Sequence, residues 1–221
     1  MKKFLATFLI FSSFIFVSSL EARSTLNGPT GLVTMPTAEA LKYKEFNLSY
    51  DYLFAKKATN DSWSYKANLG TFKSWELGVV GGSKPKEGMF LNVKYYLMSD
   101  ESRFPVMVAV GIQNISSNDL TNVYMVASKQ FQGGLGAHFG FKATFADSID
   151  PSIMVGLDYA INDAWGVMGD VGGIDKHYTL NLGTDFLLTP DVALRGSFID
   201  VANSSIEGFR WGIGLAYGKS L

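Results

Sequence analysis

The stretch that decides the fold is Leu135-Gly136-Ala137-His138-Phe139-Gly140-Phe141-Lys142-Ala143-Thr144-Phe145. Its odd-numbered residues are all apolar, and the residues between them are glycine, histidine, lysine and threonine. Successive side chains of a β-strand point to opposite faces, whereas a helix would scatter both sets around its axis. The stretch therefore predicts a strand with one apolar face and one small or polar face.

The same alternation recurs from residue 44 onward, and no segment there repeats apolar residues with helical spacing. It predicts twelve strands, at residues 44–54, 62–72, 74–83, 88–98, 104–115, 121–131, 133–146, 151–161, 164–172, 176–187, 190–200 and 208–218. Most of these are long enough for a tilted strand to cross a lipid bilayer, and longer than the usual strand of a globular protein.

The lengths of the connections also point to a membrane barrel. Tight turns follow the second, sixth, eighth and tenth predicted strands, and longer polar connections follow the first, third, ninth and eleventh. A barrel of the outer membrane has short periplasmic turns, longer outer loops and an even number of strands. The pattern therefore predicts an all-β, antiparallel, up-and-down transmembrane barrel at residues 44–221, with both ends of the chain in the periplasm.

Aromatic residues gather near both ends of the predicted strands. One group falls near the periplasmic rim, and consists of Phe46, Trp75, Phe104, Phe131, Trp165, Phe186 and Tyr217. A second falls near the outer rim, and consists of Tyr52, Phe54, Trp63, Tyr65, Phe145, Tyr178, Phe198, Phe209 and Trp211. Aromatic rings favour the level of the lipid headgroups. The alternative is a water-soluble sandwich or lipocalin-like barrel with its apolar face inward, which would not sort aromatic residues in this way.

The N-terminus predicts export. Two lysines precede a 14-residue apolar run from Phe4 to Val17, and small residues lead to Ala22. This order is typical of a secretory signal peptide at residues 1–22, and the run is short for a permanent membrane anchor. Residues 23–43 then form a segment rich in glycine and proline, which we expect to be extended and to lie at the periplasmic mouth or within the lumen. The predicted location is the bacterial outer membrane.

The opposite face of the strands carries the charged residues, which we expect to line the lumen. They are Lys66, Glu76, Lys94, His138, Lys142, Asp158, Asp170, Asp185, Arg195 and Arg210. In one interpretation, opposed acidic and basic walls create a field across a water-filled constriction. In the other, the same side chains pair and fill a narrow barrel. Twelve strands lie between barrels that side chains fill and barrels with wide channels, so both interpretations stay open.

Composition excludes several other classes of protein. A formal net charge of −1 argues against binding to nucleic acid. The chain has no cysteine and only two histidines, and it shows no cofactor motif, so we expect no cofactor and no metal site. A lipid hydrolase that uses His177 with Ser204 or Ser205 stays a third alternative, although no spacing supports it.

One resemblance adds to this picture. The opening Gly31-Leu32-Val33-Thr34-Met35-Pro36-Thr37-Ala38, with the later phrase Leu69-Gly70-Thr71-Phe72-Lys73-Ser74-Trp75-Glu76-Leu77-Gly78-Val79, resembles the YjbH-like outer-membrane family. The resemblance covers about residues 26–80 and implies a link to exopolysaccharide production. The last predicted strand resembles the C-terminal signal that the barrel assembly machinery recognises.

The sequence therefore predicts a porin-like channel for small hydrophilic solutes, surrounded by outer-membrane lipid. A non-conducting structural or exopolysaccharide-export-associated barrel is the leading alternative, and its partner would be a polysaccharide. An enzyme is not expected.

Overall fold

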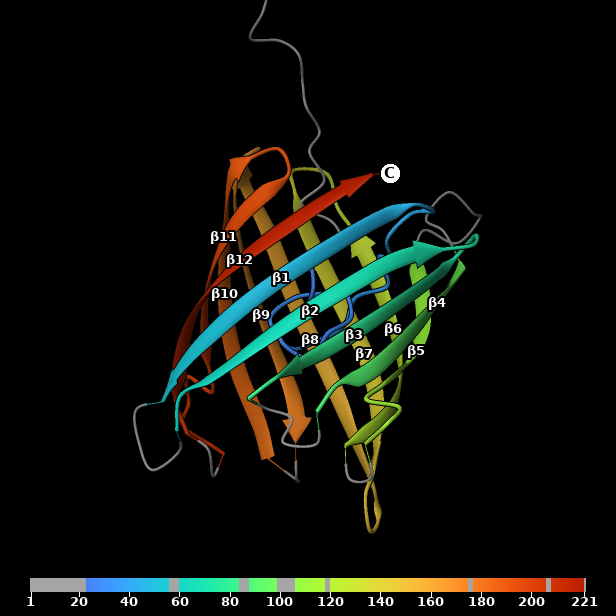
Figure 1. Ribbon diagram of the computed structural model, residues 1–221, viewed down its shortest axis with the longest axis vertical. Helices are drawn as coiled ribbons and strands as arrows, with labels where there is room; N and C mark the ends of the chain where they lie inside the picture. The colour runs from blue at the N-terminus through green and yellow to red at the C-terminus, as the bar shows by residue number, and fades with distance from the viewer. Residues whose placement is uncertain are drawn as a thin grey trace, which may run out of the picture.

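The computed structural model describes residues 23–55, 60–83, 88–98, 106–117, 120–174, 177–205 and 208–220, so the predicted signal peptide lies outside the described residues. Twelve antiparallel strands form one closed barrel, in which each strand pairs with its neighbours in sequence and β12 pairs with β1 (Figure 1). The predicted fold class is confirmed. No helix among these residues is long and apolar enough to cross a membrane.

The strands are β1 (Glu45–Ala55), β2 (Ser62–Thr71), β3 (Trp75–Gly82), β4 (Phe90–Met98), β5 (Met107–Gln113), β6 (Thr121–Gln130), β7 (Leu135–Phe145), β8 (Ile149–Asn162), β9 (Trp165–Ile174), β10 (His177–Thr189), β11 (Val192–Ile199) and β12 (Arg210–Ser220). Each predicted strand end lies within three residues of the observed one. The expected long connection after the ninth strand is wrong, because β9 continues to Ile174 and β10 already begins at His177.

The first and last strands define the two ends of the barrel. We call the end at which β1 begins and β12 stops the terminal end, and the opposite end the loop end. Continuous pairing from Glu45–Ser220 to Ala55–Arg210 joins the first and last strands, so the sheet has no open edge. Closure satisfies the backbone groups that an open edge would leave unpaired, which is what a strand needs in lipid.

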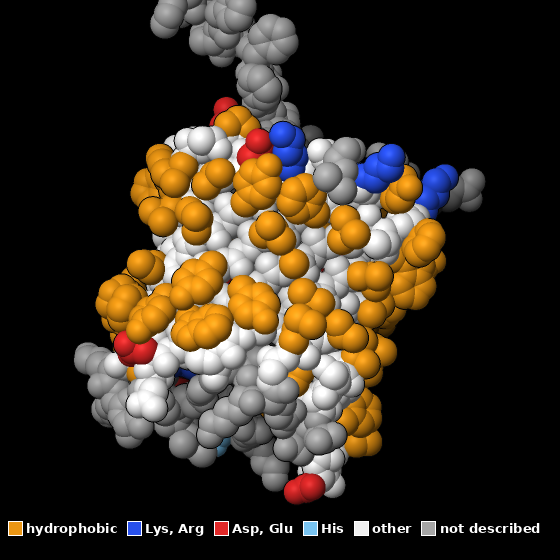
Figure 2. Space-filling view, in the orientation of Figure 1, with side chains coloured by type: hydrophobic (Ala, Val, Ile, Leu, Met, Phe, Trp, Pro, Cys, Tyr) orange, Lys and Arg blue, Asp and Glu red, His pale blue; other side chains and the backbone are white. Residues whose placement is uncertain are grey.

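The outer surface of the barrel is apolar. Side chains on the outward face of the strands, such as Phe141, Leu157 and Ile213, are about half exposed. Figure 2 shows hydrophobic side chains spread over the face in view. Aromatic rings stack between neighbouring strands, as in Tyr50 with Trp63 and Phe54 with Trp211. In water this surface would be a large exposed apolar patch, whereas in a bilayer it contacts lipid tails.

The inner surface is polar where the outer one is apolar, because the residues alternate. Lys66, Glu76, Lys94, Asp170 and Asp185 are all buried inside the barrel. The apolar contacts of the interior form between the wall and the N-terminal segment. Its residues contribute to two small buried clusters with the wall, one around Met35 and Ala38 and the other around Leu32 and Val33.

Candidate functional site

The lumen of the barrel contains the chain's own N-terminal segment. Residues 23–41, which we call the plug, fold back and forth between the strands, and residues 42–44 connect the plug to β1 at the terminal end (Figure 1). Thr30, Met35 and Ala38 of the plug are at most 1% exposed. The sequence left the position of this segment open between the periplasmic mouth and the lumen, and the structure has it in the lumen.

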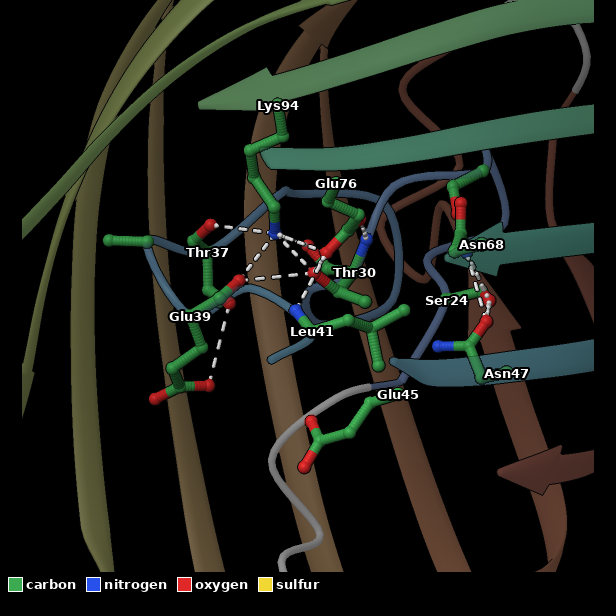
Figure 3. Close-up of polar contacts among 12 residues, drawn as sticks. Ser24, Thr30, Thr37, Glu39, Leu41, Glu45, Asn47, Asn68, Glu76 and Lys94 are labelled. Atoms are coloured by element: carbon green, nitrogen blue, oxygen red, sulfur yellow. Dashed lines mark hydrogen bonds and ion pairs between the residues drawn. The ribbon is translucent and has the colours of Figure 1, made fainter. Parts of the chain in front are cut away.

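A first anchor joins the plug to Glu76 of β3 (Figure 3). The backbone amides of Thr30 and Leu41 donate to its carboxylate at 2.9 and 3.1 Å. The hydroxyl of Thr30 also donates to it, at 2.6 Å. Hydrogen bonds to a charged acceptor are among the stronger ones, so Glu76 holds the plug at two separate points of its chain, Thr30 and Leu41.

Lys94 of β4 completes this anchor. Its ammonium nitrogen lies 3.5 Å from Glu76 Oε2, so this wall cation is paired with a wall carboxylate. It also donates to plug oxygens, namely the hydroxyl and carbonyl of Thr30 and the carbonyls of Thr37 and Glu39 (Figure 3). One ion pair of the wall thus binds both the donors and the acceptors of the plug backbone.

A second anchor is built on Asp170 of β9, and its partners are different. The carboxylate accepts the backbone amides of Thr34 and Met35 at 2.8 and 3.3 Å and the hydroxyl of Thr34 at 2.7 Å. The side-chain amide of Asn181 on β10 donates to it at 2.8 Å. All these donors are neutral, and no ion pair to Asp170 occurs among the described residues.

A chain of ion pairs links four strands to Arg23, the first residue of the plug. Lys66 of β2 contacts Asp51 of β1, and Arg195 of β11 lies between Asp51 and Asp185 of β10. Arg23 of the plug also contacts Asp185. A cavity of about 10 Å³ next to Asp51, Asp185 and Arg195 has room for about one water molecule.

His138 of β7 lies between Ser128 of β6 and Asp158 of β8. Its Nδ1 is 2.8 Å from Ser128 Oγ and its Nε2 is 2.6 Å from Asp158 Oδ1. Ser128 Oγ also accepts the backbone amide of Ala38 at 2.8 Å, so this serine joins the histidine to the plug. In the serine hydrolase triad the serine bonds Nε2 and the aspartate Nδ1, which is the reverse of this arrangement. Ser128 is also covered by the plug, so the three residues act as a third anchor.

The structure places most of the predicted lumen residues inside the barrel. Lys66, Glu76, Lys94, His138, Asp170, Asp185 and Arg195 are buried, whereas Asp158, Lys142 and Arg210 are half-buried. The plug contacts of Thr30, Thr34 and Ser128 were missed. For the two threonines, the only signal in the sequence is their place among the glycines and prolines of residues 28–38; for Ser128 there is none.

The proposed hydrolase residues are not brought together. The hydroxyls of Ser204 and Ser205 donate to Asp200 at 2.8 and 2.7 Å and not to His177. No group of three or more potential metal ligands of the His, Cys, Asp or Glu type occurs in the described part of the chain.

No protein-family model and no curated protein sequence matches the chain, so the resemblance to the YjbH-like family stays a prediction. Solved structures do match. The KdgM porin superposes with a TM-score of 0.59 at 10% identity, over 77% of this chain and 98% of that chain.

The NanC porin matches with a TM-score of 0.55 at 12% identity, over 78% and 98% of the two chains. The outer membrane protein Omp33 of Acinetobacter baumannii matches with a TM-score of 0.52 at 13% identity, over 80% and 98%. The chain therefore shares the barrel fold of outer-membrane porins.

Proposed function

We propose that this protein is an outer-membrane channel for small hydrophilic solutes, and that the plug closes it in the state described above. The observation that supports this most strongly is the sorting of residues across one closed sheet. Apolar side chains face outward, and charged side chains, including both signs, face the lumen. A polar lumen within an apolar cylinder is the arrangement of a water-filled pore.

The plug determines when such a pore conducts. It fills the lumen at three anchors, so solute passage requires the plug to withdraw from at least part of the wall. Each anchor bond is a single hydrogen bond or ion pair that water replaces when the plug leaves, with a net cost of about 1 kcal/mol for a neutral bond. The binding of a segment held in this way is reversible, whereas a strand that is paired within the sheet stays in place.

A second candidate function is favoured by the same filled lumen. With the plug permanently in place, the barrel would be a non-conducting structural or exopolysaccharide-export-associated protein, in line with the YjbH-like resemblance. The KdgM porin was also solved in complex with disordered oligogalacturonate, so a barrel of this fold has a saccharide ligand. Outer-membrane lipid around the barrel and the assembly machinery at β12 are partners in both proposals.

A disulfide lock separates the two candidates. The natural chain has no cysteine, and Ala38 N lies 2.8 Å from Ser128 Oγ, which puts the two backbones within disulfide range. In planar bilayers, the variant A38C/S128C should carry no current when oxidised and should show ion-permeable openings after reduction. Absence of current in both states and in the natural protein would reject the channel, and equal current in both states would reject closure by the plug.

The matched control ties two wall strands without the plug. Gln113 of β5 and Asn122 of β6 lie directly opposite each other, so Q113C/N122C forms its disulfide within the sheet. Its current should not depend on reduction. A redox-sensitive current in this control would show that the lock acts through the barrel wall and not through the plug.

A further inference from the structure

The part of the plug at Asp170 fills a recess in the barrel wall. Residues Leu32 to Met35 form a tight turn, closed by a hydrogen bond of 2.9 Å from Leu32 N to Met35 O. Two wall positions near Asp170 are glycines, Gly156 directly across on β8 and Gly183 two residues beyond Asn181 on β10. A side chain at Gly156 would overlap Leu32, and one at Gly183 would meet Val33. The wall therefore has no side chain at either of the two positions against which the turn packs.

In the described part of the chain, no cationic side chain forms an ion pair with the carboxylate in this recess. The other well-buried wall carboxylates have one within the wall itself: Lys66 for Asp51, Lys94 for Glu76 and Arg195 for Asp185. Asp170 is 1% exposed, and three of its four hydrogen bonds come from the plug. When the plug leaves, the wall keeps its three ion pairs but Asp170 keeps only Asn181. The uncompensated wall charge at this place is negative.

Asn181 cannot rotate to change this balance. Its carbonyl oxygen accepts the backbone amide of Asp200 at 3.0 Å, which leaves its NH2 group to donate to Asp170. The side chain is fully buried. The recess thus has a fixed acceptor pair, the two carboxylate oxygens, and a fixed orienting amide before any solute enters.

From this geometry we infer that Asp170, Asn181, Gly156 and Gly183 form a lumenal binding site for small organic cations that carry N–H donors, such as a guanidinium or a primary ammonium. The turn at Thr34 and Met35 occupies the site in the closed state, with two N–H groups and one hydroxyl on the carboxylate. A guanidinium presents the same donors together with the missing positive charge. This inference rests on the proposed channel function and gives it a solute class.

The test uses the full chain with the plug loosened at the first anchor, Glu76 and Lys94. The variant E76Q/K94M removes an ion pair and several plug bonds without a change in net charge, and leaves the Asp170 recess intact. Agmatine, which carries a guanidinium and an ammonium, should block the current of this variant in planar bilayers. Glucuronate, an anion of similar size, should not block it.

Three substitutions in that background locate the site. D170N should weaken the block by agmatine at least about tenfold, since a hydrogen bond to a charged group contributes about 1.5–3 kcal/mol. G183L keeps the charge but fills the recess, and should weaken the block to a similar degree. D158N makes the same charge change elsewhere in the lumen, next to His138, and should change the block less than about threefold.

Equal weakening by D170N and D158N would overturn the inference, since it would show only a general lumenal charge. Calorimetry of agmatine binding to the detergent-solubilised E76Q/K94M variant tests the binding site without any measurement of current. If agmatine binds and D170N abolishes the binding, but the protein carries no current, the site is supported and the proposed channel is contradicted. Current without agmatine binding would contradict the site and leave the channel in place.

Discussion

Two anchors hold the same plug in different ways. At Glu76 the wall supplies both charges, because Lys94 lies 3.5 Å from the carboxylate. At Asp170 the wall supplies only the negative charge, and neutral donors of the plug satisfy it. The first anchor is electrically complete without the plug and the second is not. The comparison shows that burial of a charge does not by itself reveal its role, since the two carboxylates are buried to nearly the same extent.

The largest effect is expected at the first anchor. E76Q leaves the Lys94 ammonium buried without its carboxylate, and should lower the free energy of unfolding by about 3–5 kcal/mol. Urea unfolding of the protein in lipid vesicles measures this. The double variant E76Q/K94M should recover a large part of the loss, because a buried pair replaced as a unit costs little. If the double variant loses as much as the sum of the single variants, the ion pair is not the cause.

A smaller effect is expected at the second anchor. D170N weakens three bonds to the plug but also removes a buried charge that has no cation, so the loss should be about 1–3 kcal/mol in the same unfolding assay. The isosteric side chain leaves the wall packing unchanged. A loss as large as that of E76Q would show that Asp170 has a cationic partner after all, and the contrast between the anchors would then disappear.

The smallest effect concerns a third carboxylate, Asp200, in the connection after β11. Its burial alone would raise its pKa, but the backbone amides and hydroxyls of Ser204 and Ser205 outweigh this and lower the pKa to about 2. The folded-state pKa lies below the unfolded value, so the carboxylate stabilises this loop above about pH 4 and the contribution is lost as the pH falls through 2.

Carboxyl carbon chemical shifts followed against pH would measure this titration. The variant S204A/S205A should raise the pKa of Asp200 toward its ordinary value, because half of its donors are lost. A midpoint at the ordinary value in the natural protein would show that the neutral donors of Ser204 and Ser205 do not hold the Asp200 carboxylate ionised.

The barrel could be predicted from the sequence because alternation repeats in every strand. Even β8, which was predicted at residues 151–161, differs little: it starts two residues earlier, at Ile149, and ends one residue later, at Asn162. The pairing of charges could be predicted only as one of two options. The alternation along each strand places Glu76 and Lys94 inside the barrel, but their contact depends on the register of β3 against β4.

The plug could not be predicted for a different physical reason. Its anchors are mostly backbone amides, at Thr30, Thr34, Met35, Ala38 and Leu41, and every residue except proline carries such a group. The sequence therefore contains no pattern that shows which backbone amide binds which carboxylate of the wall. The glycines at 156 and 183 make room for side chains of the plug, and a glycine in a strand does not by itself indicate which segment will pack against it.

The pairing of β1 with β12 has a consequence for assembly. The plug is the first part of the described chain and the last strand is its end, yet only their combination produces an enclosed interior. Until β12 has docked, the plug faces an unfinished wall, and its contact with Asp185 waits for late strands such as β10. The plug is therefore fully enclosed only when β12 is paired with β1, so the strand pair that closes the sheet also completes the lumen that holds the plug.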